Sequence, residues 1–379
     1  MTAQWRPHFP IFEHSVYLNS CSHGALSHEV EAAYRAYLDT RHACGADWQG
    51  WMERQDRLRG RLGRLVNAAP SEIAITTSAS ASLNALVSAL APAGGRHRIV
   101  TSDFEFPTAG QIWHAQEPRG FKVVHAPERA PGEIPLEAYE RLIDDRTLAV
   151  SVAHVCYRHG AMQDLAAIGD LARSKGALFI VDAFQSLGAV PIDVKALGID
   201  ALIGGNLKYL LGSAGVGFLY IREDLTQKLT PFATGWFAQA DIDAMDIYRN
   251  DPAPDARRFE SGTLPVPALH AGEAGLGIIL EAGVEEIRSH VGKLTERLKA
   301  GVAEMGGRLA TPVEPGRHGA MIAIRTTDMH AMVARLAERR IIASCRDGNL
   351  RISPHLYNTE ADIDAALEAI ADHRELLAT

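Results

Sequence analysis

Residues 178–221, LFIVDAFQSLGAVPIDVKALGIDALIGGNLKYLLGSAGVGFLYI, contain three short apolar runs joined by glycine-rich turns. The first run ends in Asp182, the second ends in a pair of glycines, and Lys208 follows that pair. Similar runs alternate with helical patterns from about residue 70: EIAIT, HRIV, KVVHA, LAVSVAHV, ALFIVDA, DALIGG and VGFLYI. This alternation predicts an α/β domain in which a mainly parallel, seven-stranded sheet has helices on both faces.

A smaller unit is expected after this domain. Residues 228–265 have no clear period and are rich in proline, aspartate and aromatic residues, which indicates a long functional loop. A long helix is expected next, and then three short strands (MIAIRT, IIASC and LRISP) with helices at 328–339 and from about 360, which predict a small α+β domain. We therefore expect a large domain over 16–260 and a small domain made of 1–15 and 261–379.

Composition limits the possible partners. The chain has 379 residues, 47% of them hydrophobic and 22% charged, which is ordinary for a soluble enzyme. A net charge of -8 without acidic or basic blocks argues against nucleic acid or a membrane as the main partner. The richest basic run, RLRGRLGR at 57–64, is predicted to be a solvated helix face, because its leucines recur at helical spacing.

The four cysteines indicate neither a disulfide framework nor a metal site. They stand at 21, 44, 156 and 345, with no CxxC pair and no zinc-like spacing to histidines. The first residues, MTAQWRPHFPIF, lack a signal-peptide pattern, and no run of 18 apolar residues occurs. We predict a cytoplasmic protein without a bound metal.

Asp182 and Lys208 indicate the chemistry. In open parallel sheets ligands bind beyond the carboxyl ends of the strands, and both residues follow such ends. A carboxylate on an apolar strand needs a cationic partner, because an unpaired buried charge is costly. An amine and a carboxylate that face one crevice match pyridoxal 5'-phosphate (PLP), which needs a Schiff-base lysine and an acid for its pyridine nitrogen. The segment ITTSASASLN at 75–84 supplies a helix N-terminus for the phosphate.

Three segments carry a family resemblance: the run from Asp182 to Arg222, RFESGT at 258–263 and LRISPHLYNTEADID at 350–364. Together they resemble the class V aminotransferases, a family of fold-type I PLP enzymes that includes cysteine desulfurases, kynureninases, isopenicillin N epimerase and small-molecule transaminases. The resemblance covers nearly the whole chain. It implies fold and cofactor much more specifically than reaction.

The resemblance assigns the cofactor site. Lys208 would form the Schiff base, Asp182 would pair with the pyridine nitrogen, and Gln185 would bond the phenolic oxygen. Ala79, through its amide, and Ser80, through its hydroxyl, would hold the phosphate.

The resemblance also assigns residues around that site. Phe106 would stack on the cofactor ring, where desulfurases have a histidine, and Tyr157 would lie near the phenolic oxygen and the substrate. Arg351 would bind the substrate carboxylate, a task suited to a guanidinium. Thr263 would reach the phosphate of the neighbouring subunit, so a homodimer with shared active sites is expected.

The sequence departs from the family pattern next to the lysine. Gly205 stands where many relatives have a phosphate-binding serine, and Leu207 replaces the residue that precedes the lysine in many relatives. Asn206 is expected to compensate for the lost phosphate contact by binding the phosphate itself. Trp236 and His23 are expected to contact the substrate.

The reaction stays open between two main alternatives. Transamination of an α-amino acid is favoured, because it needs only Lys208 to move the proton. A lyase like kynureninase or a selenocysteine or cysteine lyase is the alternative, supported by the fragments FPT, CYRHG and GWF. Epimerisation and desulfuration are weaker alternatives. The interval between Arg346 and Arg351 is too short for the cysteine loop of a desulfurase, and Cys345 is predicted to be structural.

Two other classes of function are disfavoured by the sequence. A PLP fold used for binding without turnover conflicts with the presence of Lys208, Asp182 and Arg351. A nicotinamide-binding enzyme is disfavoured because no GxGxxG follows an early strand.

Overall fold

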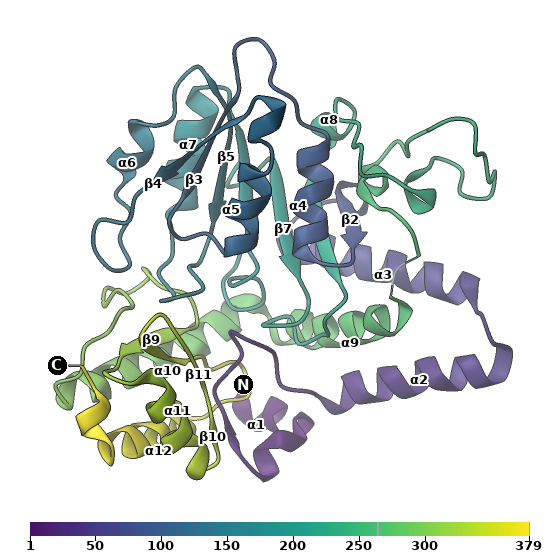
Figure 1. Cartoon of the computed structure of the whole chain (residues 1–379). Coiled ribbons are helices and arrows are strands. Elements are labelled where there is room, and N and C mark those ends of the chain that lie inside the picture. Colours follow the sequence, from purple (N-terminus) through teal and green to yellow (C-terminus); the bar gives the residue numbers. More distant parts are fainter. Residues whose placement is uncertain (264, 379) are drawn as a thin grey trace.

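The computed structural model of the protein describes residues 1–263 and 265–378, and its largest element is a seven-stranded sheet (Figure 1). In spatial order the strands are β2 (Ile73–Thr76), β8 (Gly217–Ile221), β7 (Ala201–Gly205), β6 (Leu178–Asp182), β5 (Thr147–Ala153), β3 (Arg98–Ser102) and β4 (Lys122–Ala126). Strand β8 is antiparallel to β2 and β7, and all other neighbours are parallel. The predicted fold class is confirmed.

Both faces of this sheet are buried, which explains its continuous apolar strands. In β6, Phe179 and Val181 belong to one core cluster, whereas Ile180 between them belongs to the other. The Ile180 face is covered by α4 (Ala79–Ser88) and α5 (Pro107–His114). The opposite face is covered by α3 (Trp48–Val66), α6 (Leu136–Glu140), α7 (Leu165–Ser174) and α9 (Val266–Ala282).

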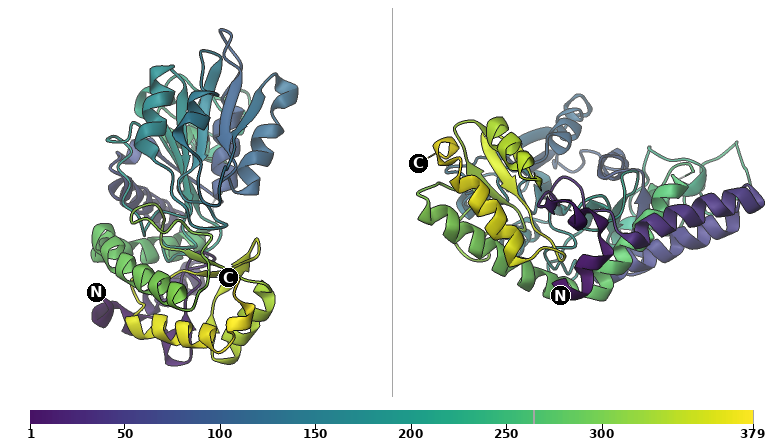
Figure 2. Two further views of the ribbon diagram at one scale, coloured as in Figure 1. Left: turned by 90° about the vertical axis from the view of Figure 1, so that its left-hand side faces the viewer. Right: turned by 90° about the horizontal axis from the view of Figure 1, so that it is seen from below.

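The C-terminal part has a core of its own around a three-stranded antiparallel sheet. Its strands, in spatial order, are β11 (Ser344–Arg346), β12 (Asn349–Ile352) and β9 (Ile322–Arg325). Its helices are α10 (Val284–Glu304), α11 (Met329–Glu338) and α12 (Glu360–Ala371). Figure 2 shows α12, in yellow, at the end of the molecule away from the seven-stranded sheet.

The predicted strand IIASC is wrong as one strand. Its first two residues form β10 (Ile341–Ile342), which pairs in parallel with β1 (Val16–Tyr17), and its end enters β11. The N-terminal segment supplies the partner for β10, a long-range pairing that no local pattern reveals. The same segment continues along the C-terminal part, where Asn19 bridges to Ser353.

The predicted solvated face at 57–64 is wrong for Arg59. Its side chain is 7% exposed and donates to Glu260 Oε1 at 2.6 Å and to the Ile73 carbonyl at 2.7 Å. The neighbouring Arg57 pairs with Glu273 of α9 at 2.8 Å. Because hydrophobic spacing marks only which face is apolar, it could not reveal that buried carboxylates lie opposite these arginines.

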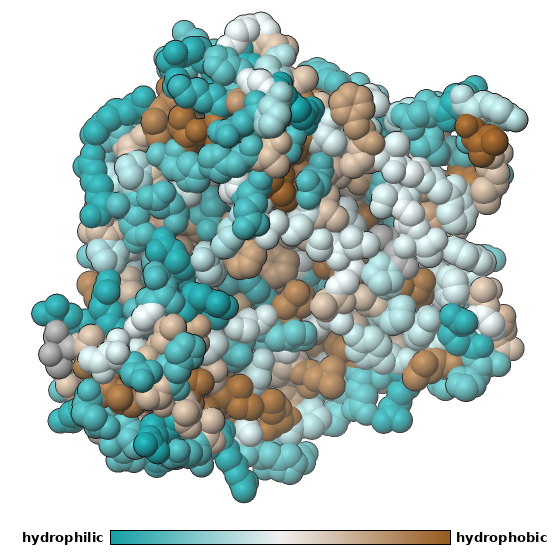
Figure 3. Space-filling view, in the orientation of Figure 1, coloured by the Kyte–Doolittle hydropathy of each residue, from teal (hydrophilic) through white to brown (hydrophobic). Residues whose placement is uncertain are grey.

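Residues 240–251 form a loop that projects from the body, as the upper right of Figure 1 shows, and its surface is partly apolar, whereas Phe237 and Phe259 on either side are buried. Met245, Ile247 and Tyr248 are 63%, 84% and 92% exposed. The face shown in Figure 3 is otherwise largely hydrophilic, with hydrophobic residues in small separate groups. No helix in the described part of the chain is both long and apolar enough to span a membrane.

The remaining helices are short or peripheral. They are α1 (Thr2–Trp5), α2 (His28–Cys44), α8 (Glu223–Thr226) and the 3₁₀ helices η1 (Arg6–His8), η2 (Pro10–Glu13), η3 (Pro70–Glu72), η4 (Glu117–Arg119), η5 (Trp236–Ala238), η6 (Ala256–Phe259) and η7 (Arg374–Leu376).

Candidate active site

A cavity of about 290 Å³ lies at the carboxyl edge of the seven-stranded sheet. Strands β3, β5, β6 and β7 end there, and β2 ends there too, because both β2 and β7 are antiparallel to β8. The residues predicted for the site that line this cavity are Ala79, Ser80, Phe106, Tyr157, Asp182, Gln185 and Lys208.

Lys208 follows β7 and lies against an aromatic ring. Its Nζ is 4.6 Å from the centroid of the Phe184 ring. Burial lowers the pKa of the Lys208 amine to about 8, although the nearby Asp182 carboxylate opposes this shift. A large fraction of this amine is therefore neutral near pH 8, which is the form that can act as a nucleophile or base.

Asp182 is the last residue of β6 and points its carboxyl group into the cavity wall. Its Oδ1 accepts a hydrogen bond of 2.9 Å from the Phe184 backbone N–H. Burial raises the pKa of this carboxyl group, and Lys208 only partly opposes the shift. A cationic ring nitrogen in the cavity would stabilise the ionised form, as Arg and Lys partners do in other sites.

The N-terminus of α4 opens into the same cavity. Ser78 caps the helix by accepting a 3.1 Å hydrogen bond from the Ala81 N–H, and Ala79 and Ser80 form the first turn. The first residue of β8 lies directly behind this turn: a Cβ at Gly217 would lie 2.2 Å from the Ser78 carbonyl carbon. The glycine therefore permits a close backbone approach that leaves the helix N-terminus free for an anion.

Aromatic side chains form two walls of the cavity. Phe106 precedes α5 and meets Tyr157 edge to face, with ring centroids 5.0 Å apart. Phe184 lies close to Gly205, where a Cβ would come within 2.3 Å of its ring. Flat apolar walls, a carboxylate, an amine and a helix N-terminus together fit a phosphorylated aromatic aldehyde such as PLP.

Two residues without a predicted role contact residues that line the cavity. Glu105 Oε1 accepts hydrogen bonds of 2.8 Å from Ser102 Oγ and from the Ala153 N–H. Burial, with a contribution from Asp182, raises the pKa of Glu105 to about 8, so this carboxyl group is mainly protonated at neutral pH. Cys21 is buried, and its carbonyl accepts a 3.1 Å hydrogen bond from Gln185 Nε2. Neither residue lies in a recognisable local motif.

Arg351, on the C-terminal part, contacts the backbone of one cavity residue, Tyr157, but does not itself line the cavity. It is buried on β12, and its Nη1 donates to the Tyr157 carbonyl at 2.8 Å, whereas its Nη2 donates to Ser344 Oγ at 3.0 Å. Its Nε is buried without a hydrogen-bond partner among the described residues. Cys345 lies on the opposite face of β11 from Ser344, with its Sγ 3.6 Å from Nδ1 of His330.

Five of the predicted residues do not line the cavity: Arg351, described above, and the four that follow. The Asn206 side chain is fully buried and lies against Gly272 of α9 instead. His23 is exposed, and its Nδ1 lies 2.9 Å from the carbonyl of Gly24. Trp236 packs edge to face against Trp48. Thr263 is exposed.

Comparisons with known proteins agree with this geometry. The family model for aminotransferase class-V matches residues 25–366. An uncharacterized aminotransferase of Bacillus subtilis, YcbU, is 35% identical over 97% of both chains. A kynureninase of Pseudomonas fluorescens is 28% identical over 98% of this chain and 92% of its own. A probable cysteine desulfurase of Methanothermobacter thermautotrophicus is 28% identical over 98% of both.

Solved structures with the same fold include two PLP-type enzymes of sulfur chemistry. The apo cysteine desulfurase of Thermococcus onnurineus superposes with a TM-score of 0.88 at 23% identity, over 98% of both chains. The cystine C–S lyase C-DES, in complex with cysteine persulfide, superposes with a TM-score of 0.87 at 22% identity, over 96% of this chain and 99% of its own. At these identities the likeness establishes the fold alone.

Proposed function

Because the chain belongs to the class V aminotransferase family of PLP-dependent enzymes, we propose that it is an aminotransferase acting at the Cα of an α-amino acid. The proposal rests on the few side chains around the cavity that can accept or donate a proton. The residues lining the cavity include three ionisable side chains, Lys208, Asp182 and Tyr157. With Asp182 assigned to the cofactor ring, Lys208 is the base best placed at the reacting carbon, and transamination needs one base.

Each assigned side chain has a defined task in this proposal. When bound, PLP supplies an electron sink for the bond that is broken at Cα. Lys208 would accept the proton from Cα of the substrate and hold it for return. Asp182 and Phe106 would hold the cofactor, Asp182 through the ring nitrogen and Phe106 against one face of the ring. Arg351 binds the α-carboxylate and so orients the Cα–H bond.

A lyase is the second candidate, and Tyr157 favours it. Its ring lines the cavity and meets Phe106, so its hydroxyl could deliver a proton to a departing side-chain fragment. A desulfurase receives less support, because Cys345 lies against His330 and not on the Ser344 face of β11 that Arg351 contacts.

The test is an absorption spectrum of the holoenzyme with a panel of amino acids, with products identified by mass. For a transaminase, the visible band of the cofactor is lost with the substrate and returns only when a keto acid such as pyruvate or 2-oxoglutarate is added. If the band returns unaided while a side-chain fragment such as sulfide is released together with a shortened amino acid such as alanine, the protein is a lyase and the proposal is wrong.

We also propose a homodimer in which Thr263 reaches the partner's phosphate site. Thr263 is exposed and does not line the cavity of its own chain, and Ile247 and Tyr248 expose apolar surface on the same segment. Sedimentation of the holoenzyme is expected to give twice the chain mass. A monomer with full cofactor affinity would contradict this proposal. A cytoplasmic location, which the four free cysteines favour, is checked by cell fractionation.

A further inference from the structure

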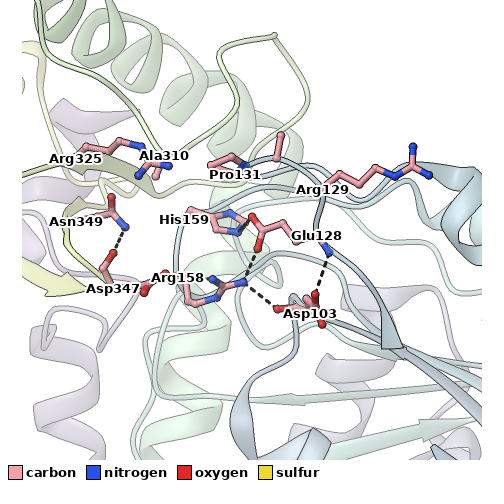
Figure 4. A pocket seen from close by; sticks show the side chains of 11 residues that line it. Asp103, Glu128, Arg129, Pro131, Arg158, His159, Ala310, Arg325, Asp347 and Asn349 are labelled. Atoms are coloured by element: carbon pink, nitrogen blue, oxygen red, sulfur yellow. Dashed lines mark hydrogen bonds and ion pairs between the residues drawn. The ribbon is translucent and has the colours of Figure 1, made fainter. Parts of the chain in front are cut away.

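A second cavity, of about 570 Å³, lies where loops after β3, β4 and β5 meet the C-terminal part (Figure 4). Arg158 stands between these elements. Its Nη2 donates to Glu128 Oε2 at 2.7 Å and to the Asp103 carbonyl at 2.9 Å, and its Nη1 donates to Asp347 Oδ2 at 3.1 Å. Arg158 therefore joins two loops of the large sheet to one residue of the small sheet.

Asp347 occupies the tip of the hairpin that carries Arg351. Strands β11 and β12 pair with Ser344 opposite Arg351, and Asp347 and Gly348 form the turn with φ values of 54° and 73°. Two successive positive φ values are typical of a tight hairpin turn, which sets the register of its strands. A displacement of the hairpin tip therefore also moves Arg351, because strands β11 and β12 are hydrogen-bonded to each other between the tip and this residue.

The other end of the connection is the segment Tyr157–Arg158. The Tyr157 carbonyl accepts the 2.8 Å hydrogen bond from Arg351 Nη1, and the next residue binds the hairpin tip. One short segment thus holds the hairpin at two points: at the tip through Asp347, and at the guanidinium of Arg351. If the contact between Arg158 and Asp347 is removed, Arg351 can tilt about its remaining hydrogen bond to the Tyr157 carbonyl.

Arg158 is itself held firmly on the side of the large sheet. Although partial burial works against it, hydrogen bonds from His159, the Gly132 N–H and Arg158 lower the pKa of Glu128 to about 2. The Glu128 carboxylate is therefore charged at every pH at which the enzyme would be assayed. Arg158 is thus held in place by Glu128 and the Asp103 carbonyl, and through Asp347 it holds the hairpin.

We propose that Arg158 and Asp347 are positioning residues that hold Arg351 for the substrate carboxylate. This inference rests on the proposed function, in which Arg351 binds that carboxylate. Neither residue lines the active-site cavity, and their connection to it runs through the hairpin that carries Arg351 and through the Tyr157 carbonyl that Arg351 contacts. The Asp347 side chain is 57% exposed, so its pair contributes modestly and the expected effect is correspondingly small.

The test compares two carbonyl reagents on the holoenzyme, aminooxyacetate and methoxyamine, which differ in the carboxylate. Each discolours the bound cofactor, and the ratio of their second-order rate constants measures carboxylate recognition. Asp347→Asn removes the ion pair but suits the positive φ of the turn, because asparagine adopts such values readily. We expect it to lower the ratio about two- to fivefold, the range of a partly exposed ion pair. The rate with methoxyamine should not change.

Three further variants make the result decisive. Arg158→Gln should give the same selective loss. Asp364→Asn, which breaks an exposed 2.6 Å pair with Arg297 on the same C-terminal part, should leave the ratio unchanged. Arg351→Gln should lower the ratio about tenfold or more, as expected for loss of a charge-assisted hydrogen bond. If Arg351→Gln has no effect, the carboxylate role in the proposed function fails.

If Arg351→Gln lowers the ratio but Asp347→Asn matches Asp364→Asn, only the positioning proposal is overturned. It is also overturned if Asp347→Asn slows both reagents equally, because that result indicates general damage to the site.

Discussion

Replacement of Lys208 by alanine is expected to lower turnover by about 10³-fold or more, since it removes both the nucleophile that holds the cofactor and the base at Cα. The side chain stands against the Phe184 ring, so a smaller residue leaves the surrounding backbone in place. The measurement is product formation with the amino acid found by the panel, together with the visible spectrum. Lys208→Arg is the matched control, because it keeps a cation there but cannot react with an aldehyde. Near-normal turnover in either variant would refute the assignment of Lys208.

The pH dependence of cofactor uptake follows from the same residue. Burial lowers the pKa of Lys208 to about 8, and the neutral amine is the form that reacts with an aldehyde. Below that pKa the reactive fraction falls tenfold per pH unit, and above it the fraction is nearly constant. The rate at which added PLP develops its visible band in the apoprotein should therefore reach half its maximum near pH 8 and level off at higher pH. A midpoint near the ordinary lysine value of 10.5 would contradict the burial argument.

Glu260→Gln is expected to lower the free energy of unfolding by about 3 to 5 kcal/mol, the usual cost of leaving one charge of a buried ion pair without its partner. Glu260 Oε1 accepts from Arg59 Nη1 at 2.6 Å and from the Ile75 N–H at 2.8 Å. Although burial disfavours a charge there, the Glu260 carboxylate raises the pKa of Arg59, which stays charged. Denaturant unfolding of the apoprotein measures the loss.

Two further variants test that explanation. Asp364→Asn, which disrupts an exposed pair, should cost less than about 1 kcal/mol. The double variant Arg59→Met with Glu260→Leu should recover most of the loss, because it removes both charges and keeps apolar volume. A double variant as unstable as Glu260→Gln would contradict the argument from an unpaired charge.

Because Ile75, which donates to Glu260, lies on the strand before α4, the single variant Glu260→Gln should also weaken cofactor binding.

The match between sequence and structure is closest where periodicity and local order decide the outcome. The seven strands and their helices follow from alternating apolar runs, which local hydrophobicity predicts well. The gathering of Asp182 and Lys208 at one edge follows from strand direction, because residues that end parallel strands meet there. The C-terminal strands were predicted less well, since β10 forms a separate two-stranded sheet with the N-terminal segment more than 300 residues away, Ile341 pairing with Val16.

The sequence by itself determined the fold class and the position of the amine and carboxylate, because each depends on residue type and spacing along short stretches, and its resemblance to a known family implied the cofactor. Only the tertiary structure decided which distant groups meet. It buried Arg59 against Glu260, turned Asn206 toward Gly272, and placed Glu105 against Ala153 of the cavity. It also connected Arg351 to Tyr157 across the two parts. Such contacts depend on how elements far apart in the chain pack, and a buried polar group takes whatever partner the packing brings within reach.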